Sequence, residues 1–200
     1  SFDDKVNLVM GNTAALAQLG PFSLEKVDAS GGLRGDSGVT AFPAPIALSA
    51  TFDRTLAYAY GAAIGIEARA HGWSVILGPT VDVERRGNSG RLPEGFGEDP
   101  LLNGVMGERV SRGMQDQHLI TCLKHFSAYT QESDRNTLDL SVSERTLHEI
   151  YNAPFYTAIE HGSALSIMGA YPRVNGAYAC ENAVLMDQLR AETGWLGFML

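Results

Sequence analysis

The chain has 200 residues, of which 44% are hydrophobic and 19% charged, and its formal net charge is −8. This length and composition are typical of a globular chain with a sizeable core, and they exclude wholesale disorder. The acidic balance argues against a nucleic-acid partner, which would need a basic surface, and no apolar run approaches the ~20 residues of a membrane span.

In chain order, short apolar runs alternate with longer amphipathic segments. A first helix is expected over residues 1–19, followed by a short strand that enters a glycine-rich loop within residues 22–38. Further strands are expected at residues 73–77, 119–123, 164–170 and 197–200. Further helices are expected at residues 53–71, from 99, from about 143 and at 182–193.

Local signals support several of these boundaries. Asp53 and the pair Asp99-Pro100 can begin helices, and Gly194 can end one. Gly78-Pro79 should close the strand at 73–77, and Pro154 should kink its helix. Residues 41–48 contain two prolines and are expected to be extended and irregular, and residues 171–181 are expected to form a loop.

Strand–loop–helix units that recur every ~30–45 residues imply parallel strands with right-handed crossovers. A doubly wound sheet and a (β/α)8 barrel both fit this pattern. Polar residues after several different strands favour the barrel, whose catalytic face lies at the carboxyl ends of its strands. We therefore predict an α/β fold of the TIM-type (β/α)8 class. A full barrel needs ~250 residues, so the barrel is expected to be incomplete in this chain.

Ionisable groups follow the predicted strands. Lys124 and His125 come directly after the strand at 119–123, and Arg135 and Asp139 follow a small, polar stretch. On spacing alone these could be a solvated strand end with an exposed Arg135–Asp139 ion pair of ~0–1 kcal/mol. In a barrel they would meet residues from the other loops: Asp28, Arg34, Arg91, Glu94, Tyr171 and Arg173. Many donors with few acceptors suit a phosphate or carboxylate site, or a sugar site.

Five collinear segments carry a family resemblance: TAFPAPIALSATFD, GPTVDVERRGNSGRLPEGFGEDP, LKHFSAYTQESDR, VSERTLHEIY and YPRVNGAYACEN. From about Val27 onward the chain resembles glycoside hydrolase family 3, which includes many β-glucosidases. The resemblance implies hydrolysis of terminal non-reducing β-D-glucosidic bonds by a retaining double displacement. The hexosaminidase-like branch has KHFPGHG where this chain has KHFSAYTQESDR, which favours the glucosidase branch.

The resemblance also implies a substrate-binding role for seven residues. Asp28 is similar to the aspartate that accepts hydrogen bonds from the sugar's O4 and O6, and Arg34 closes the same loop motif. Lys124 and His125 are similar to the pair that holds the hydroxyls of the innermost sugar. Arg91 is similar to the arginine that follows NSG in the family. Arg135 is similar to the arginine that supports the nucleophile, and Tyr171 to the tyrosine beside it. No cofactor is implied, and no ligand spacing supports a metal site.

The family's two catalytic carboxylates are not expected among these residues. The nucleophile is an aspartate just after a strand that matches GFML, where the sequence reaches Leu200, and the acid/base glutamate usually belongs to a second α/β domain. We therefore expect residues 1–200 to be the N-terminal segment of the barrel, inactive alone. The remaining strands and a second α/β domain should follow. The expected partners are a β-glucoside or glycosylated small molecule and the rest of the same enzyme, and a homodimer stays open.

Two other functions fit the same residues. Lys124 could form a Schiff base in an aldolase-like barrel, or the barrel could bind sugar without catalysis. Cys122 and Cys180 are expected to be free thiols. The acidic amphipathic start does not resemble a signal peptide, so the compartment stays open between secreted and cytoplasmic.

Overall fold

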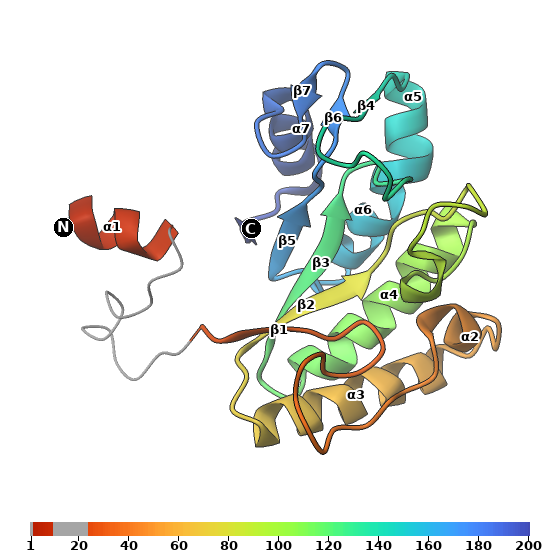
Figure 1. Cartoon of the computed structure of the whole chain (residues 1–200), viewed down its shortest axis with the longest axis vertical. Helices are drawn as coiled ribbons and strands as arrows, with labels where there is room; N and C mark the ends of the chain where they lie inside the picture. The colour runs from red at the N-terminus through yellow and green to blue at the C-terminus, as the bar shows by residue number, and fades with distance from the viewer. Residues whose placement is uncertain (1, 10–23) are drawn as a thin grey trace.

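The computed structural model describes residues 2–9 and 24–200 (Figure 1). The strands of its main sheet are β1 (Lys26–Asp28), β2 (Val75–Thr80), β3 (Ile120–Phe126), β5 (Ser166–Gly169) and β8 (Phe198–Met199). The helices are α1 (Phe2–Val9), α2 (Pro45–Ser49), α3 (Arg54–Ala70), α4 (Pro100–Gln115), α5 (Glu144–Thr146), α6 (Ala153–Glu160) and α7 (Ala183–Thr193). The helix predicted for residues 1–19 is confirmed over Phe2–Val9, and the rest of that prediction lies outside the described residues.

The five main strands form one parallel sheet in the order β1-β2-β3-β5-β8. The strands therefore lie side by side in chain order, as in a barrel, whereas a doubly wound sheet reverses its order at a switch point. Helix α3 packs on α4 and α4 packs on α6, so the crossover helices line up outside the sheet (Figure 1). The register pairs Asp28 with Leu77 and Thr80 with Lys124, which brings the carboxyl ends of β1, β2 and β3 together.

The core lies between the sheet and these helices. Large side chains that are 0% or 1% exposed fill it, among them Ile64, Ile76, Leu123 and Phe155. Helices α3 and α4 approach so closely that a Cβ on Gly61 would lie 2.0 Å from the Val110 carbonyl oxygen. Glycine at this contact is therefore required by packing, and the tight contact fixes where α3 and α4 lie against the strands.

The predicted helix boundaries are confirmed where a side chain caps the helix. Asp53 accepts hydrogen bonds from the backbone of Thr55 and Leu56 at 2.8 and 3.0 Å, and Asp99 accepts one from Leu102 at 2.8 Å. Such caps satisfy amide groups that have no partner within the helix. At the other end of α7, Gly194 adopts a left-handed conformation with φ 65° and ends the helix.

Two local predictions around prolines need correction, and the structure adds a detail to the prediction for Pro154. Residues 41–48 are not wholly irregular, because Pro45 begins the short helix α2, a position that tolerates its missing amide hydrogen. Strand β2 does not end before Gly78-Pro79 but runs on to Thr80, with a register irregularity between Leu77 and Gly78. Before Pro154 the helix widens into a π-helical segment over Leu147–Asn152, which accommodates the proline.

The sequence also missed a second, small sheet. The predicted loop at 171–181 contains an antiparallel hairpin of β6 (Arg173–Val174) and β7 (Ala177–Tyr178), and β4 (Asp139–Leu140) pairs in parallel with β6. Strands of two residues are too short for a hydrophobic period to reveal them.

Neither a membrane-spanning helix nor a metal-binding cluster was found in the part of the chain that the structure describes. No helix there combines the length and apolar character needed to cross a bilayer. No three His, Cys, Asp or Glu side chains among those residues gather closely enough to hold a metal ion. Cys122 and Cys180 are both free, as predicted.

Candidate active site

A cavity of about 440 Å³ lies at the carboxyl ends of the main strands. The structure places all seven residues singled out from the sequence around it: Asp28, Arg34, Arg91, Lys124, His125, Arg135 and Tyr171. They come from the loops or strand ends of β1, β2, β3 and β5, and the fold alone brings them together. A second cavity of about 360 Å³ adjoins the first and shares four of its lining residues: Asp28, Arg34, Glu94 and Lys124.

The floor of the cavity is built on strand β3, which extends to Phe126 rather than ending at Leu123. Lys124 therefore lies within the strand, where its side chain is 3% exposed and its Nζ donates to Asp28 Oδ1 at 2.5 Å. Burial raises the pKa of Asp28, but the hydrogen bond and charge of Lys124, with Arg34 and Arg91, outweigh it and hold the pKa below its usual 3.8. The pair links β1 to β3 across β2 and keeps the carboxylate ionised.

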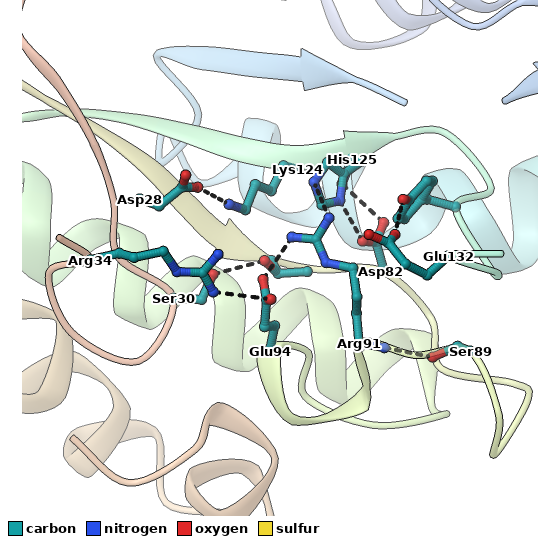
Figure 2. A network of polar contacts seen from close by, with 12 residues as sticks. Asp28, Ser30, Arg34, Asp82, Ser89, Arg91, Glu94, Lys124, His125 and Glu132 are labelled. Carbon is teal, nitrogen blue, oxygen red and sulfur yellow. Dashed lines mark hydrogen bonds and ion pairs between the residues drawn. The ribbon is translucent and has the colours of Figure 1, made fainter. Parts of the chain in front are cut away.

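His125 is held from below by a residue that the sequence analysis did not select. Asp82 follows β2 and is 5% exposed; its Oδ1 accepts from the His125 backbone amide at 2.9 Å. Its Oδ2 lies 2.7 Å from the ring Nδ1 of His125. The other ring nitrogen, Nε2, lies 3.3 Å from Nη1 of Arg91 (Figure 2).

Glu94 joins two arginines from different loops. Its Oε2 accepts from Nη2 of Arg91 at 2.8 Å, and its Oε1 lies 3.4 Å from Nη2 of Arg34 (Figure 2). Burial raises the pKa of Glu94, but the hydrogen bond and charge of Arg91 outweigh it and bring the pKa below its usual value. The sequence analysis expected Glu94 among the residues that meet at this face but assigned it no role, and the structure shows that it lines both cavities.

The loop after β3 forms one wall of the cavity. Arg135 donates to Glu132 Oε1 at 2.8 Å, and its guanidinium lies 4.5 Å from the centroid of the Tyr171 ring. The hydroxyl of Tyr129 donates to the same carboxylate. Burial and the neighbouring Glu132 raise the pKa of Tyr129. Stacking of this kind orients the arginine without using its remaining donors.

Two other residues do not reach the cavity, and those expectations were wrong. Asp139 lies in β4, where its Oδ1 accepts from the Gly176 amide at 3.1 Å. Arg173 lies in β6 and stacks on Tyr178, with its guanidinium 4.5 Å from the ring centroid. Pairing within the small sheet holds both residues away from the main strands. The alternative of a solvated strand end is also wrong, because Lys124 is buried.

Sequence reasoning missed two acceptors, Asp82 and Glu132, and it expected Glu94 near the site without assigning it a role. A signal for Asp82 was available, because it lies between two buried valines in VDV just beyond β2. A carboxylate between buried apolar neighbours requires a partner. Glu94 and Glu132 occupy loops whose folded path no short-range pattern predicts.

Fixed donors and acceptors therefore alternate around a cavity of suitable size for a small polar molecule. Among the described residues, every carboxylate that lines it is already bonded to a cation: Asp28, Glu94 and Glu132. A hydroxyl both donates and accepts, so such a wall suits a ligand rich in hydroxyls.

Comparison with known proteins decides the family. The sequence profile described as the glycosyl hydrolase family 3 N terminal domain matches residues 13–200. The chain belongs to glycosyl hydrolase family 3. The probable β-glucosidase L of Aspergillus fumigatus is 41% identical over 193 residues, which is 96% of this chain and 26% of the relative.

Solved structures of the family agree in fold. β-Glucosidase 3B of Thermotoga neapolitana, solved in complex with glucose, superposes with a TM-score of 0.83 at 37% identity, covering 88% of this chain and 26% of that one. β-Glucosidase D2-BGL of Chaetomella raphigera has a TM-score of 0.88 at 40% identity, covering 92% and 26%. The predicted α/β fold is confirmed: the five parallel strands are part of the family's TIM-type barrel, incomplete in this chain.

The chain spans about a quarter of the length of the curated relatives it matches. Those relatives are named β-glucosidases, so hydrolysis of glucosides is the activity for which similar proteins are named.

Proposed function

We propose that the complete protein containing this chain is a retaining β-glucosidase and that residues 1–200 supply its glucose-binding subsite. The observation that supports this most is the single cavity of about 440 Å³ on which all seven selected residues converge. The remaining barrel strands and a second α/β domain would follow these residues.

In this proposal the cavity holds the terminal glucose of a β-glucoside. Asp28 accepts hydrogen bonds from O4 and O6 while Lys124 keeps it ionised, and charged acceptors form bonds roughly twice as strong as neutral ones. Lys124 and His125 hold neighbouring hydroxyls, and Arg34 and Arg91 close the side of the cavity toward the β1 and β2 loops. Such fixed dipoles need no reorganisation when the glycosidic bond breaks.

A retaining enzyme needs a nucleophilic carboxylate and an acid/base carboxyl ~5–5.5 Å apart. The family's sequence pattern after GFML assigns the nucleophile to an aspartate just after Leu200. Position supports this assignment, because Leu200 is hydrogen-bonded to Gly169 at 2.9 Å beside β5. The chain thus arrives at the face that carries Tyr171 and Arg135, whose charge would favour an ionised nucleophile.

The test uses the complete protein and an aryl β-glucoside. The sequence beyond Leu200 is determined, hydrolysis is measured, and the first-formed anomer of glucose is identified by NMR. We expect an aspartate there and β-glucose as the first product. α-Glucose as the first product would refute the retaining mechanism. Glucose binding without turnover would leave the non-catalytic barrel as the function.

The Schiff-base alternative has less structural support. Nζ of Lys124 already donates to Asp28 at 2.5 Å, whereas a Schiff-base lysine needs a free amine in a desolvated pocket. Borohydride trapping of a carbonyl compound on Lys124, found by peptide mass spectrometry, would revive it.

A further inference from the structure

Asp82 makes two hydrogen bonds to one residue and none of its own to the cavity. Its side chain is 4% exposed, and both carboxylate oxygens face His125 (Figure 2). The 2.9 Å bond holds the His125 backbone amide at the end of β3, and the 2.7 Å bond holds its ring. Asp82 does not line the cavity, so its contact with the cavity passes through His125.

These two bonds determine which ring nitrogen carries the proton. An ionised carboxylate only accepts hydrogen bonds, so Nδ1 of His125 must be the donor. Nε2 faces Nη1 of Arg91 at 3.3 Å, and an arginine only donates. The single arrangement that satisfies both neighbours is a neutral ring with its proton on Nδ1 and a lone pair on Nε2. The ring of Tyr129, 4.8 Å away between centroids, packs against the imidazole and limits its rotation.

The lone pair on Nε2 matters because, among the described residues, each carboxylate that lines the cavity is already bonded to a cation. Arg91, Lys124 and Arg135 supply donors, and a sugar hydroxyl that accepts from them must place its own hydrogen on an acceptor. Nε2 of His125 is such an acceptor, and it is already engaged by Arg91 at 3.3 Å. A hydroxyl that takes this position would donate to Nε2 and accept from the arginine.

We propose that Asp82 is a positioning residue that sets the His125 tautomer, and that this tautomer lets His125 accept a hydrogen bond from a glucose hydroxyl. The expected effect on kcat/KM rests on the proposed glucosidase function. The position of the proton on the His125 ring is independent of that function.

Substitution Asp82→Asn keeps the size of the side chain, but it removes the negative charge and replaces one acceptor oxygen by an –NH2 donor. The backbone amide of His125 takes the remaining oxygen, and the amide –NH2 group then points at Nδ1 and donates to it. The proton must move to Nε2, where it faces Arg91. We expect kcat/KM for an aryl β-glucoside to fall by about 10²-fold, as when one preorganised polar contact is lost.

The decisive measurement is ¹⁵N NMR of the complete protein labelled in its histidine rings, with His125→Gln used to assign the signal. We expect the His125 proton on Nδ1 in the wild type and on Nε2 in Asp82→Asn. A wild-type proton on Nε2 overturns the proposal even if no variant folds. A folded Asp82→Asn protein with kcat/KM within about threefold of the wild type also overturns it.

The matched control is Glu108→Gln. Glu108 is equally buried, at 2% exposed, and its carboxylate accepts from Ser163 and pairs with Arg109, so it bears no contact to the cavity. We expect this variant to lose stability while the His125 tautomer and kcat/KM stay unchanged. If the wild-type protein hydrolyses no β-glucoside, the proposed function fails, and the tautomer measurement still decides whether Asp82 positions His125.

Discussion

The Lys124–Asp28 pair allows a test in which two variants that break the same bond differ in stability. Lys124 Nζ is 2.5 Å from Asp28 Oδ1, but the two side chains are 3% and 40% exposed. Substitution Asp28→Ala leaves a buried ammonium without its partner, whereas Lys124→Met removes the buried charge and leaves a carboxylate that water can reach. The cost of breaking a buried pair depends mainly on the charge left behind.

The magnitudes follow from these exposures. Breaking a buried pair costs ~3–5 kcal/mol, and the half-open position of Asp28 favours the lower limit, ~3 kcal/mol, for Asp28→Ala. Substitution Lys124→Met replaces the ammonium by an apolar side chain and should lower the free energy of unfolding by no more than ~1 kcal/mol. The gap of ~2 kcal/mol corresponds to about 4–8 °C in the unfolding midpoint of a barrel domain of roughly 250 residues. The double variant should be as stable as Lys124→Met within ~0.5 kcal/mol.

Calorimetry of the complete protein gives the midpoints, and aryl β-glucoside kinetics give the functional effect. Under the proposed function both Asp28→Asn and Lys124→Ala lower kcat/KM by at least ~10²-fold. If Lys124→Met destabilises the protein as much as Asp28→Ala does, the reasoning from burial is refuted. Near-normal kcat/KM in both Asp28→Asn and Lys124→Ala would refute the residue assignments. Because the pKa of Asp28 is lowered, its contribution to stability exists above pH 3.8 and disappears as the pH falls below it.

Three further predictions use residues outside the substrate contacts. Burial raises the pKa of Glu84 from 4.5 to about 7, so the folded protein loses stability as pH rises through that window. Calorimetry should therefore find that the free energy of unfolding of Glu84→Gln equals that of the wild type at pH 4.5. At pH 8 the variant should be the more stable of the two, by no more than ~3 kcal/mol. Gly113→Ala would place a Cβ 2.2 Å from the Tyr58 carbonyl oxygen and should cost at least ~1–3 kcal/mol by the same method, whereas Gly87→Ala meets nothing within 4 Å and should be neutral. Burial raises the pKa of the Cys122 thiol to about 11, so peptide mapping should find it unmodified by iodoacetamide at pH 8 until the protein is denatured.

Much of the fold could be predicted from short-range signals. Strands β2, β3, β5 and β8 contain short apolar runs, and helices α3, α4 and α7 begin at side chains that cap them: Asp53, Asp99 and Asn182. These signals act within four residues, so sequence alone contains them in full. Their positions after predicted strands grouped the seven cavity residues, and the family resemblance added their roles in sugar binding.

The sequence by itself therefore determined the strand–helix alternation, the helix ends and the set of donors expected at the site. Only the tertiary structure decided which charges meet. It placed Lys124 inside β3 because Asp28 and the register of β1, β2 and β3 supply a partner for its buried charge. It added Asp82 beneath His125, and it moved Asp139 and its neighbours into a second sheet. Contacts between residues many positions apart depend on strand register and on the paths of the crossovers, and no local pattern encodes either.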